Sequence, residues 1–218
     1  MSKPVIILGG GGHASVLVDI LVNQGRDILA LISPNNIKER RVFDGLKHYA
    51  SDDYVLSFSA DEIELVNGIG SLPGETARFE IYKKFTNLGY VFSSVISSAS
   101  IVSKIVELSN GVQIMPGAII NAGVIIGGNT IINSGAIIEH DCRIGENNHI
   151  APGVSISGNV ITDKQVHVGT GASIIQNIEL GENVVVGAGA IVTCNVPSFS
   201  TVYSYRAHIT GRYLNNES

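Results

Sequence analysis

Aliphatic residues recur at every sixth position through the second half of the chain. Counting in sixes from Ile96 to Val192 gives seventeen positions, of which sixteen are aliphatic and one is Thr162. A six-residue period fits neither an α-helix nor an alternating strand, but it fits a short strand followed by a bend. Three such hexads make one triangular coil, so the pattern predicts a parallel β-helix of between five and six coils.

The first half shows a different pattern, in which short apolar runs alternate with segments of helical spacing. The expected elements are strands at residues 5–8, 28–32 and 63–69 and helices at residues 15–23 and 75–88. This alternation predicts a small α/β domain with a Rossmann-like parallel sheet. The expected organisation is an α/β domain over residues 1–92, a β-helix over residues 93–197 and a C-terminal tail over residues 198–218.

Composition narrows the possible functions. Ile and Val make up 53 of the 218 residues and Trp is absent, which suits a narrow interior filled by small branched side chains. The net charge of −5 and the pI near 5.6 give no attraction to nucleic acid or anionic lipid, so neither is an expected partner. The first apolar run, residues 5–8, is too short for a secretion signal or a membrane span, so we expect a cytoplasmic protein. In the reducing cytoplasm, Cys142 and Cys194 are expected to be buried hydrophobic residues rather than to form a disulfide.

A glycine-rich turn follows the first predicted strand. The spacing Gly9-x-Gly11-x-x-Ala14, between a strand and a helix, satisfies the dinucleotide fingerprint. The acidic residue that would hold a ribose hydroxyl is absent, because the second predicted strand is followed by Ser33 and Pro34. We therefore expect this turn to bind the pyrophosphate of a nucleotide sugar rather than NAD. The alternative is a tight turn with no ligand.

One hexad of the repeat contains candidate catalytic residues. Glu139, His140 and Asp141 are successive ionisable residues on a β-helix wall that is otherwise poor in charge. A carboxylate beside a histidine holds its ring and raises its basicity, and such a pair suits removal of a proton from an attacking amine or hydroxyl. The alternative is a solvated polar face.

A metal site is not expected. His149 and His167 lie one coil apart and are predicted to stack on one edge, whereas His140 is half a coil away from His149. Because catalytic zinc needs three convergent ligands, a third histidine would have to come from a neighbouring subunit.

The stretch from Ile132 to Cys142, with His149 nine residues after His140, resembles the bacterial sugar acyltransferases. These include the sialic acid O-acetyltransferases and the 4-amino-sugar N-acetyltransferases. The resemblance covers almost the whole chain and is greatest to the GDP-perosamine N-acetyltransferases. It is weaker to the UDP-sugar members, in which acidic residues follow the second strand. It implies a left-handed β-helix, a homotrimer and an acyl donor lying in the groove between neighbouring subunits.

The resemblance also implies roles for individual residues. His140 is the implied general base, Asp141 orients and activates it, and Asn133 lies near the acceptor sugar. The implied nucleotide-sugar contacts are Gly11, Gly12 and His13, to which we add Ser33, and the implied acetyl-CoA contacts are His149, Thr170 and Ala188. The C-terminal segment departs from the relatives, which usually have a Gly-x-Pro-Ala-Lys-like stretch where this chain has residues 204–208.

The expected function is therefore acetyl-CoA-dependent N-acetylation of the 4-amino group of a nucleotide-linked amino-dideoxysugar. GDP-perosamine is the first expected substrate, a UDP-4-amino-sugar is the second, and the implied setting is lipopolysaccharide O-antigen biosynthesis. Two alternatives stay open: a sugar O-acetyltransferase of the sialic acid type, and a scaffold without catalysis that binds nucleotide sugar or CoA.

Overall fold

The α/β part of the chain is built on a four-stranded parallel sheet. A computed structural model describes residues 3–37 and 39–205. The sheet has the strand order β3-β2-β1-β4, and every pair in it is parallel. Its elements are β1 (Val5–Leu8), α1 (Gly12–Asn23), β2 (Ile28–Ile32), η1 (Arg41–Phe43), β3 (His48–Tyr49), η2 (Asp52–Ser57), β4 (Glu64–Asn67) and α2 (Ala77–Asn87).

The predicted strands at residues 5–8 and 28–32 are confirmed, and the third shortens to β4. The first helix begins at Gly12 rather than at residue 15, because the last glycine of the turn already belongs to its first turn. The pattern missed β3, which is very short and is held by pairing with β2.

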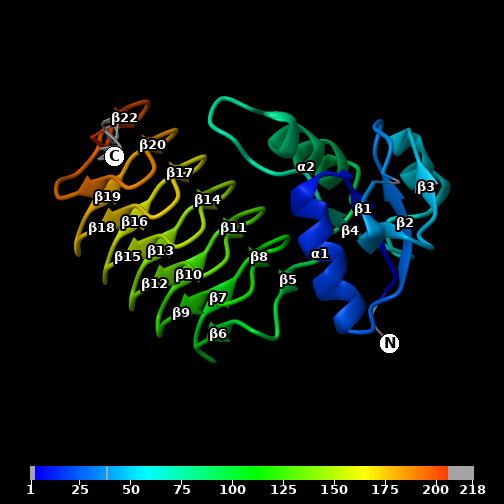
Figure 1. The fold of residues 1–218 in the computed structure, drawn as a ribbon, viewed down its shortest axis with the longest axis horizontal. Coiled ribbons are helices and arrows are strands. Elements are labelled where there is room, and N and C mark those ends of the chain that lie inside the picture. The colour runs from blue at the N-terminus through cyan, green and yellow to red at the C-terminus, as the bar shows by residue number, and fades with distance from the viewer. Residues whose placement is uncertain (1–2, 38, 206–218) are drawn as a thin grey trace, which may run out of the picture.

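The second half is a parallel β-helix with three sheets of stacked two-residue strands. Figure 1 shows the coils stacking away from the α/β part. The strands are β5 (Val95–Ile96), β6 (Ile101–Val102), β7 (Glu107–Leu108), β8 (Gln113–Ile114), β9 (Ile119–Ile120), β10 (Ile125–Ile126), β11 (Ile131–Ile132), β12 (Ile137–Ile138), β13 (Arg143–Ile144), β14 (His149–Ile150), β15 (Ser155–Ile156), β16 (Ile161–Thr162), β17 (His167–Val168), β18 (Ser173–Ile174), β19 (Glu179–Leu180), β20 (Val185–Val186), β21 (Ile191–Val192) and β22 (Thr201–Val202).

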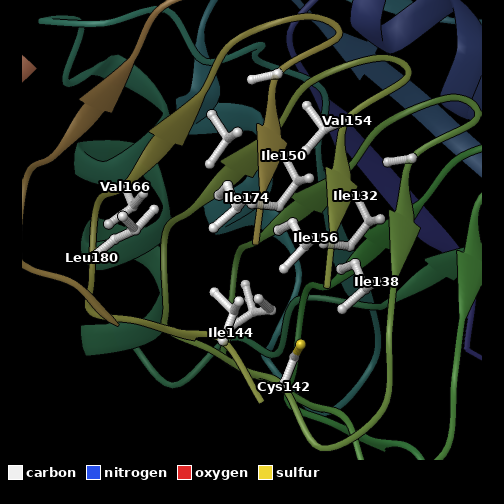
Figure 2. Packing of buried hydrophobic residues seen from close by; sticks show 14 of the residues in the cluster. Ile132, Ile138, Cys142, Ile144, Ile150, Val154, Ile156, Val166, Ile174 and Leu180 are labelled. Carbon is white, nitrogen blue, oxygen red and sulfur yellow. The ribbon is translucent and has the colours of Figure 1, made fainter. Parts of the chain in front are cut away.

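Each coil returns to the same register after three hexads. Ile132 pairs with Ile150, and at the next coil Ile150 pairs with Val168. The second residue of each strand points inward, and Figure 2 shows these side chains from successive coils meeting in one narrow interior. Ile132, Ile150 and Val168 are fully buried, and each such side chain contributes about 1.5–3 kcal/mol to stability. The interior is therefore a ladder of small aliphatic residues.

The one polar residue in the ladder is accommodated by hydrogen bonds. The Thr162 hydroxyl accepts hydrogen bonds from the Asn148 amide at 2.6 Å and from the Gly145 backbone N–H at 3.1 Å. Because buried polar groups cost little only when they are paired, this bonding explains how threonine fits the interior.

The last coil is shorter than the others. β22 pairs with β20 in a register that joins Val186 to Val202, so this coil falls short of three full hexads. A count in sixes cannot find such a strand. The sheet thus extends to β22, within the segment that the sequence pattern assigns to the tail.

Cys142 is buried in the interior as predicted, but the prediction for Cys194 was wrong. Cys194 is exposed because it lies beyond β21, where the six-residue period stops.

Helix α1 packs between the four-stranded sheet and the first coils of the β-helix (Figure 1). Leu17 and Val18 share a buried cluster with Val95, Met115 and Ile131 of the β-helix. This contact covers the β-helix face formed by β5, β8 and β11, and it fixes the glycine-rich turn beside that face. Among the residues that the structure describes, no helix is both long and apolar enough to cross a membrane.

Candidate active site

The glycine-rich turn joins β1 to α1, and its glycines have different roles. Gly9 has φ 116°, and a Cβ there would lie 2.8 Å from the backbone of Gly68. A Cβ on Gly10 would lie 2.8 Å from the Cβ of Ser33. A Cβ on Gly11 would meet nothing within 4 Å. The first two glycines are therefore needed for packing, and Gly11 leaves bare backbone open to a ligand.

This turn lines a pocket of about 960 Å³. Gly11, Gly12, His13 and Ser33 all contribute to its wall. Helix α1 starts here, and no side chain caps its first N–H groups. The positive end of the helix and the bare glycine backbone together suit a phosphate group.

Arg40 brings a positive charge to the same pocket. A Cβ on Gly12 would lie 4.0 Å from the Arg40 guanidinium, and Arg40 is exposed. Sequence reasoning missed this residue, because it lies in an irregular segment with no motif. Its only signal was a pair of adjacent arginines, Arg40 and Arg41, after the second strand.

Ser33 packs against Gly10 of the glycine-rich turn. It is 3% exposed, its hydroxyl accepts a hydrogen bond from the Asn35 N–H, and its carbonyl oxygen bonds to His48 Nε2 at 2.8 Å. Since a Cβ on Gly10 would clash with it, Ser33 shapes the wall of the pocket through packing.

A second pocket, of about 410 Å³, lies between the α/β part and the β-helix and joins His13, Asn133 and His149. The Nδ1 atom of His149 lies 2.8 Å from the carbonyl oxygen of Ser71, and its Nε2 atom lies 3.1 Å from the amide nitrogen of Asn133. A carbonyl oxygen only accepts, so Nδ1 carries the proton and Nε2 accepts from Asn133. Burial, with the neighbouring His167 ring, lowers the pKa of His149 to about 4. His149 is therefore neutral at pH 7.

A buried arginine, Arg78, is hydrogen-bonded to Ile69 in the wall of this pocket. Arg78 is 5% exposed, and among the described residues its guanidinium donates hydrogen bonds only to uncharged oxygens. The acceptors are Asn129 O, Asn67 O, Ile69 O and Gln113 Oε1. Burial lowers the pKa of the Arg78 guanidinium to about 9. His13 donates to the same Gln113 oxygen at 2.7 Å, and burial with the Arg78 charge lowers the pKa of His13 to about 4.

His140 and Asp141 form a hydrogen-bonded pair at a corner of the β-helix. His140 Nδ1 lies 2.8 Å from an Asp141 carboxylate oxygen, and the side chains are 63% and 68% exposed. The carboxylate accepts from Nδ1, which leaves Nε2 as the atom able to take a proton. The pair was expected on a wall, but it lies in the turn between β12 and β13 because Asp141 adopts the left-handed conformation, with φ 60°.

Thr170 and Ala188 lie on a different corner. Both are exposed, and they stack one coil apart through a hydrogen bond from the Gly189 N–H to the Thr170 oxygen. The face made by β6, β9, β12, β15, β18 and β21 separates this corner from that of His140. One chain therefore does not bring the expected CoA contacts next to the His140–Asp141 pair. Of the departing segment 204–208, residues 206–208 lie outside the described residues.

Comparison with known proteins identifies both halves of the chain. Residues 4–85 match the PglD N-terminal domain, and residues 123–158 match the bacterial transferase hexapeptide repeat. The chain is a hexapeptide-repeat acyltransferase with a PglD-type N-terminal domain. Its β-helix is accordingly left-handed.

Solved structures share this two-part fold. A perosamine N-acetyltransferase variant from Caulobacter crescentus, in complex with CoA and GDP-perosamine, is 28% identical with a TM-score of 0.83, over 97% of this chain and 99% of that one. The acetyltransferase domain of PglB from Neisseria gonorrhoeae, in complex with acetyl coenzyme A, is 24% identical with a TM-score of 0.83, over 92% of this chain and 96% of that one. The second likeness supports the fold alone.

Cys142 of this acyltransferase is not placed as a nucleophile. Cys142 points into the interior, burial raises the pKa of its thiol, and its Sγ donates to the Ser157 oxygen at 3.2 Å.

His149 and His167 pack edge to face with ring centroids 4.9 Å apart. Over the described residues, no three His, Cys, Asp or Glu side chains are grouped to hold a metal ion. A hydrogen-bonded histidine–carboxylate pair such as His140–Asp141 is chemically suited to proton transfer.

Proposed function

We propose that this acyltransferase transfers the acetyl group of acetyl-CoA to the 4-amino group of a nucleotide-linked amino-dideoxysugar, in the cytoplasm, for surface polysaccharide synthesis. GDP-perosamine is the first candidate acceptor and a UDP-4-amino-sugar the second. The observation that carries the proposal is the combination of an open glycine turn with a His–Asp pair in one chain. The likeness to perosamine N-acetyltransferase over 97% of the chain supports it.

The diphosphate of the nucleotide sugar is proposed to lie against Gly11 and Gly12. The uncapped start of α1 and the Arg40 guanidinium supply positive charge there. The sugar is proposed to extend toward the second pocket and to contact Asn133 and His13, which line it.

The proposed chemistry is direct transfer between the two bound substrates. The sugar amine attacks the thioester carbonyl carbon, forming the new C–N bond, and the C–S bond to CoA breaks. His140 Nε2 accepts the proton that the amine loses and returns it to the leaving thiolate. General-base catalysis of this kind is worth about 10²–10⁴ in rate. Asp141 holds the Nδ1–H and stabilises the charged ring.

The active site is proposed to form between subunits of a homotrimer. The β-helix face that carries β6, β9 and β12 presents Ile101, Ile119 and Ile137, and Ile101 is 67% exposed. Packing this face around a threefold axis brings the His140 corner of one subunit toward the Thr170 corner of the next. Thr170 and Ala188, with His149 at the inner end of the groove, are the proposed CoA contacts.

The trimer is tested by charge substitution on this face. Ile119→Asp is expected to dissociate the trimer and abolish turnover, because a carboxylate would be buried in an apolar contact. Ile161→Asp, on the neighbouring face, is the matched control and should leave the assembly intact. Light scattering reads the mass, and an Ile119→Asp protein that remains trimeric and active would contradict this interface.

The substrate is tested by thermal shift with GDP, UDP, CMP and CoA. A ligand near or above its dissociation constant raises the melting temperature only if it binds the folded protein. Stabilisation by GDP and by CoA is expected. Stabilisation by CMP alone would favour the sialic acid type of O-acetylation, and no response to CoA would favour a scaffold.

A further inference from the structure

The His140–Asp141 pair is well formed although it is exposed. Adjacent charged groups on a surface usually gain little from pairing, because solvent screens them and their side chains remain free to rotate. Here the side chains are 63% and 68% exposed, yet Nδ1 and the carboxylate oxygen are 2.8 Å apart. What holds the His140 ring against the Asp141 carboxylate must therefore be sought in the residues of the adjacent coils.

The coil that follows leaves space for the imidazole ring. Gly158 lies one coil beyond His140, and a Cβ on Gly158 would lie 2.6 Å from Cε1 and 2.7 Å from Nε2 of that ring. A Cβ atom essentially never lies this close to a non-bonded heavy atom. The ring thus occupies the volume that any side chain at position 158 would fill.

The backbone does not require glycine at position 158. Left-handed φ values occur on this side of the β-helix at Gly123, Asp141, Asn159 and Asn177, and Gly158 is not among them. Ala122 and Gln176 hold the equivalent corner position in the coils two before and one after. A side chain is therefore compatible with this corner, and the His140 ring is the reason for its absence at Gly158.

We propose that Gly158 is a positioning residue for the catalytic pair. The missing side chain lets the His140 ring lie across the Gly158 backbone with Nδ1 on Asp141. This inference rests on the proposed function of His140 as the general base. On the other side of the pair, a Cβ on Gly123 would lie 2.5 Å from an Asp141 oxygen, but Gly123 also has φ 78°, a left-handed conformation that favours glycine, so packing against the pair is not the sole reason for glycine there.

Gly158→Ala tests the proposal, because it adds one methyl group and keeps the backbone N–H. We expect kcat to fall at least about tenfold, toward the loss caused by removing the base, while KM for both substrates changes little. The melting temperature should stay within about 2 °C, since the exposed ring can swing away and alanine is tolerated in this corner row. Gln176→Ala, one coil further, is the matched control and should keep full activity.

Nitrogen NMR of ¹⁵N-histidine-labelled protein supplies a readout that does not need the acceptor. In the wild type, His140 should hold its proton on Nδ1 and show an unprotonated Nε2. In Gly158→Ala the two tautomers should mix, with the signal assigned by its loss in His140→Ala. An unchanged His140 signal together with wild-type kcat in Gly158→Ala would overturn the role of Gly158. Normal turnover in His140→Ala would instead overturn the proposed base.

Discussion

Replacing Arg78 with methionine tests the buried junction between the sheet and the β-helix. Four oxygens accept from its guanidinium: Asn67 O, Ile69 O, Asn129 O and Gln113 Oε1. In the variant, Asn67 O still accepts a hydrogen bond from Gln113 Nε2, and Gln113 Oε1 still accepts one from His13. The oxygens of Ile69 and Asn129 lose their side-chain donor, which costs about 1–3 kcal/mol at the buried Asn129 oxygen and less at the part-buried Ile69 oxygen.

Part of this cost is offset, because methionine removes a buried cation that has no carboxylate beside it in the described structure. The net loss should be about 2–4 kcal/mol, which corresponds to a fall of about 4–16 °C in melting temperature. Calorimetry measures it, and Arg41→Met, at an exposed arginine, should shift by no more than about 2 °C. An Arg78→Met protein as stable as the wild type would refute the view that these hydrogen bonds join the two halves.

Two further predictions concern protonation and phosphate binding. His13 and His149 have pKa values lowered from 6.5 to about 4, so the unfolded chain binds their protons first and stability falls as the pH drops from 6.5 toward 4. Between pH 7 and pH 5 the loss should be about 2 kcal/mol for each histidine in urea unfolding, and a flat profile would contradict the burial of these rings. Arg40→Gln should weaken GDP binding about tenfold in titration calorimetry and leave CoA binding unchanged. Arg41→Gln is the control. Equal effects of the two variants on GDP binding would show that Arg40 does not contact the phosphate.

The sequence predicts most of the fold because a repeated coil repeats its chemistry. Ile132, Ile150 and Val168 follow one another at intervals of one full coil, and each must fill the same narrow interior. The elements that the pattern missed have no such repetition. Strand β3 is too short to show a period, and β22 returns before three hexads are complete, so neither can be found by counting.

The site was predictable only where its partners are close in sequence or one coil apart. His140 and Asp141 are adjacent, and the glycine turn is a continuous motif. The bond from Arg78 to Gln113 joins residues 35 apart, and that from His149 to Ser71 joins residues 78 apart. Their contact depends on how α1 and the following loops dock on the β-helix. Sequence spacing does not encode that docking.

The most direct test of the central claim is mass spectrometry of the products formed from acetyl-CoA when GDP-perosamine and sialic acid are each offered as the acceptor. The wild-type protein is predicted to release CoA and to add one acetyl group at the sugar nitrogen, with turnover about 10²–10⁴-fold lower in His140→Ala. A product acetylated only on a sialic acid hydroxyl, with the amino sugar left unmodified, would contradict it.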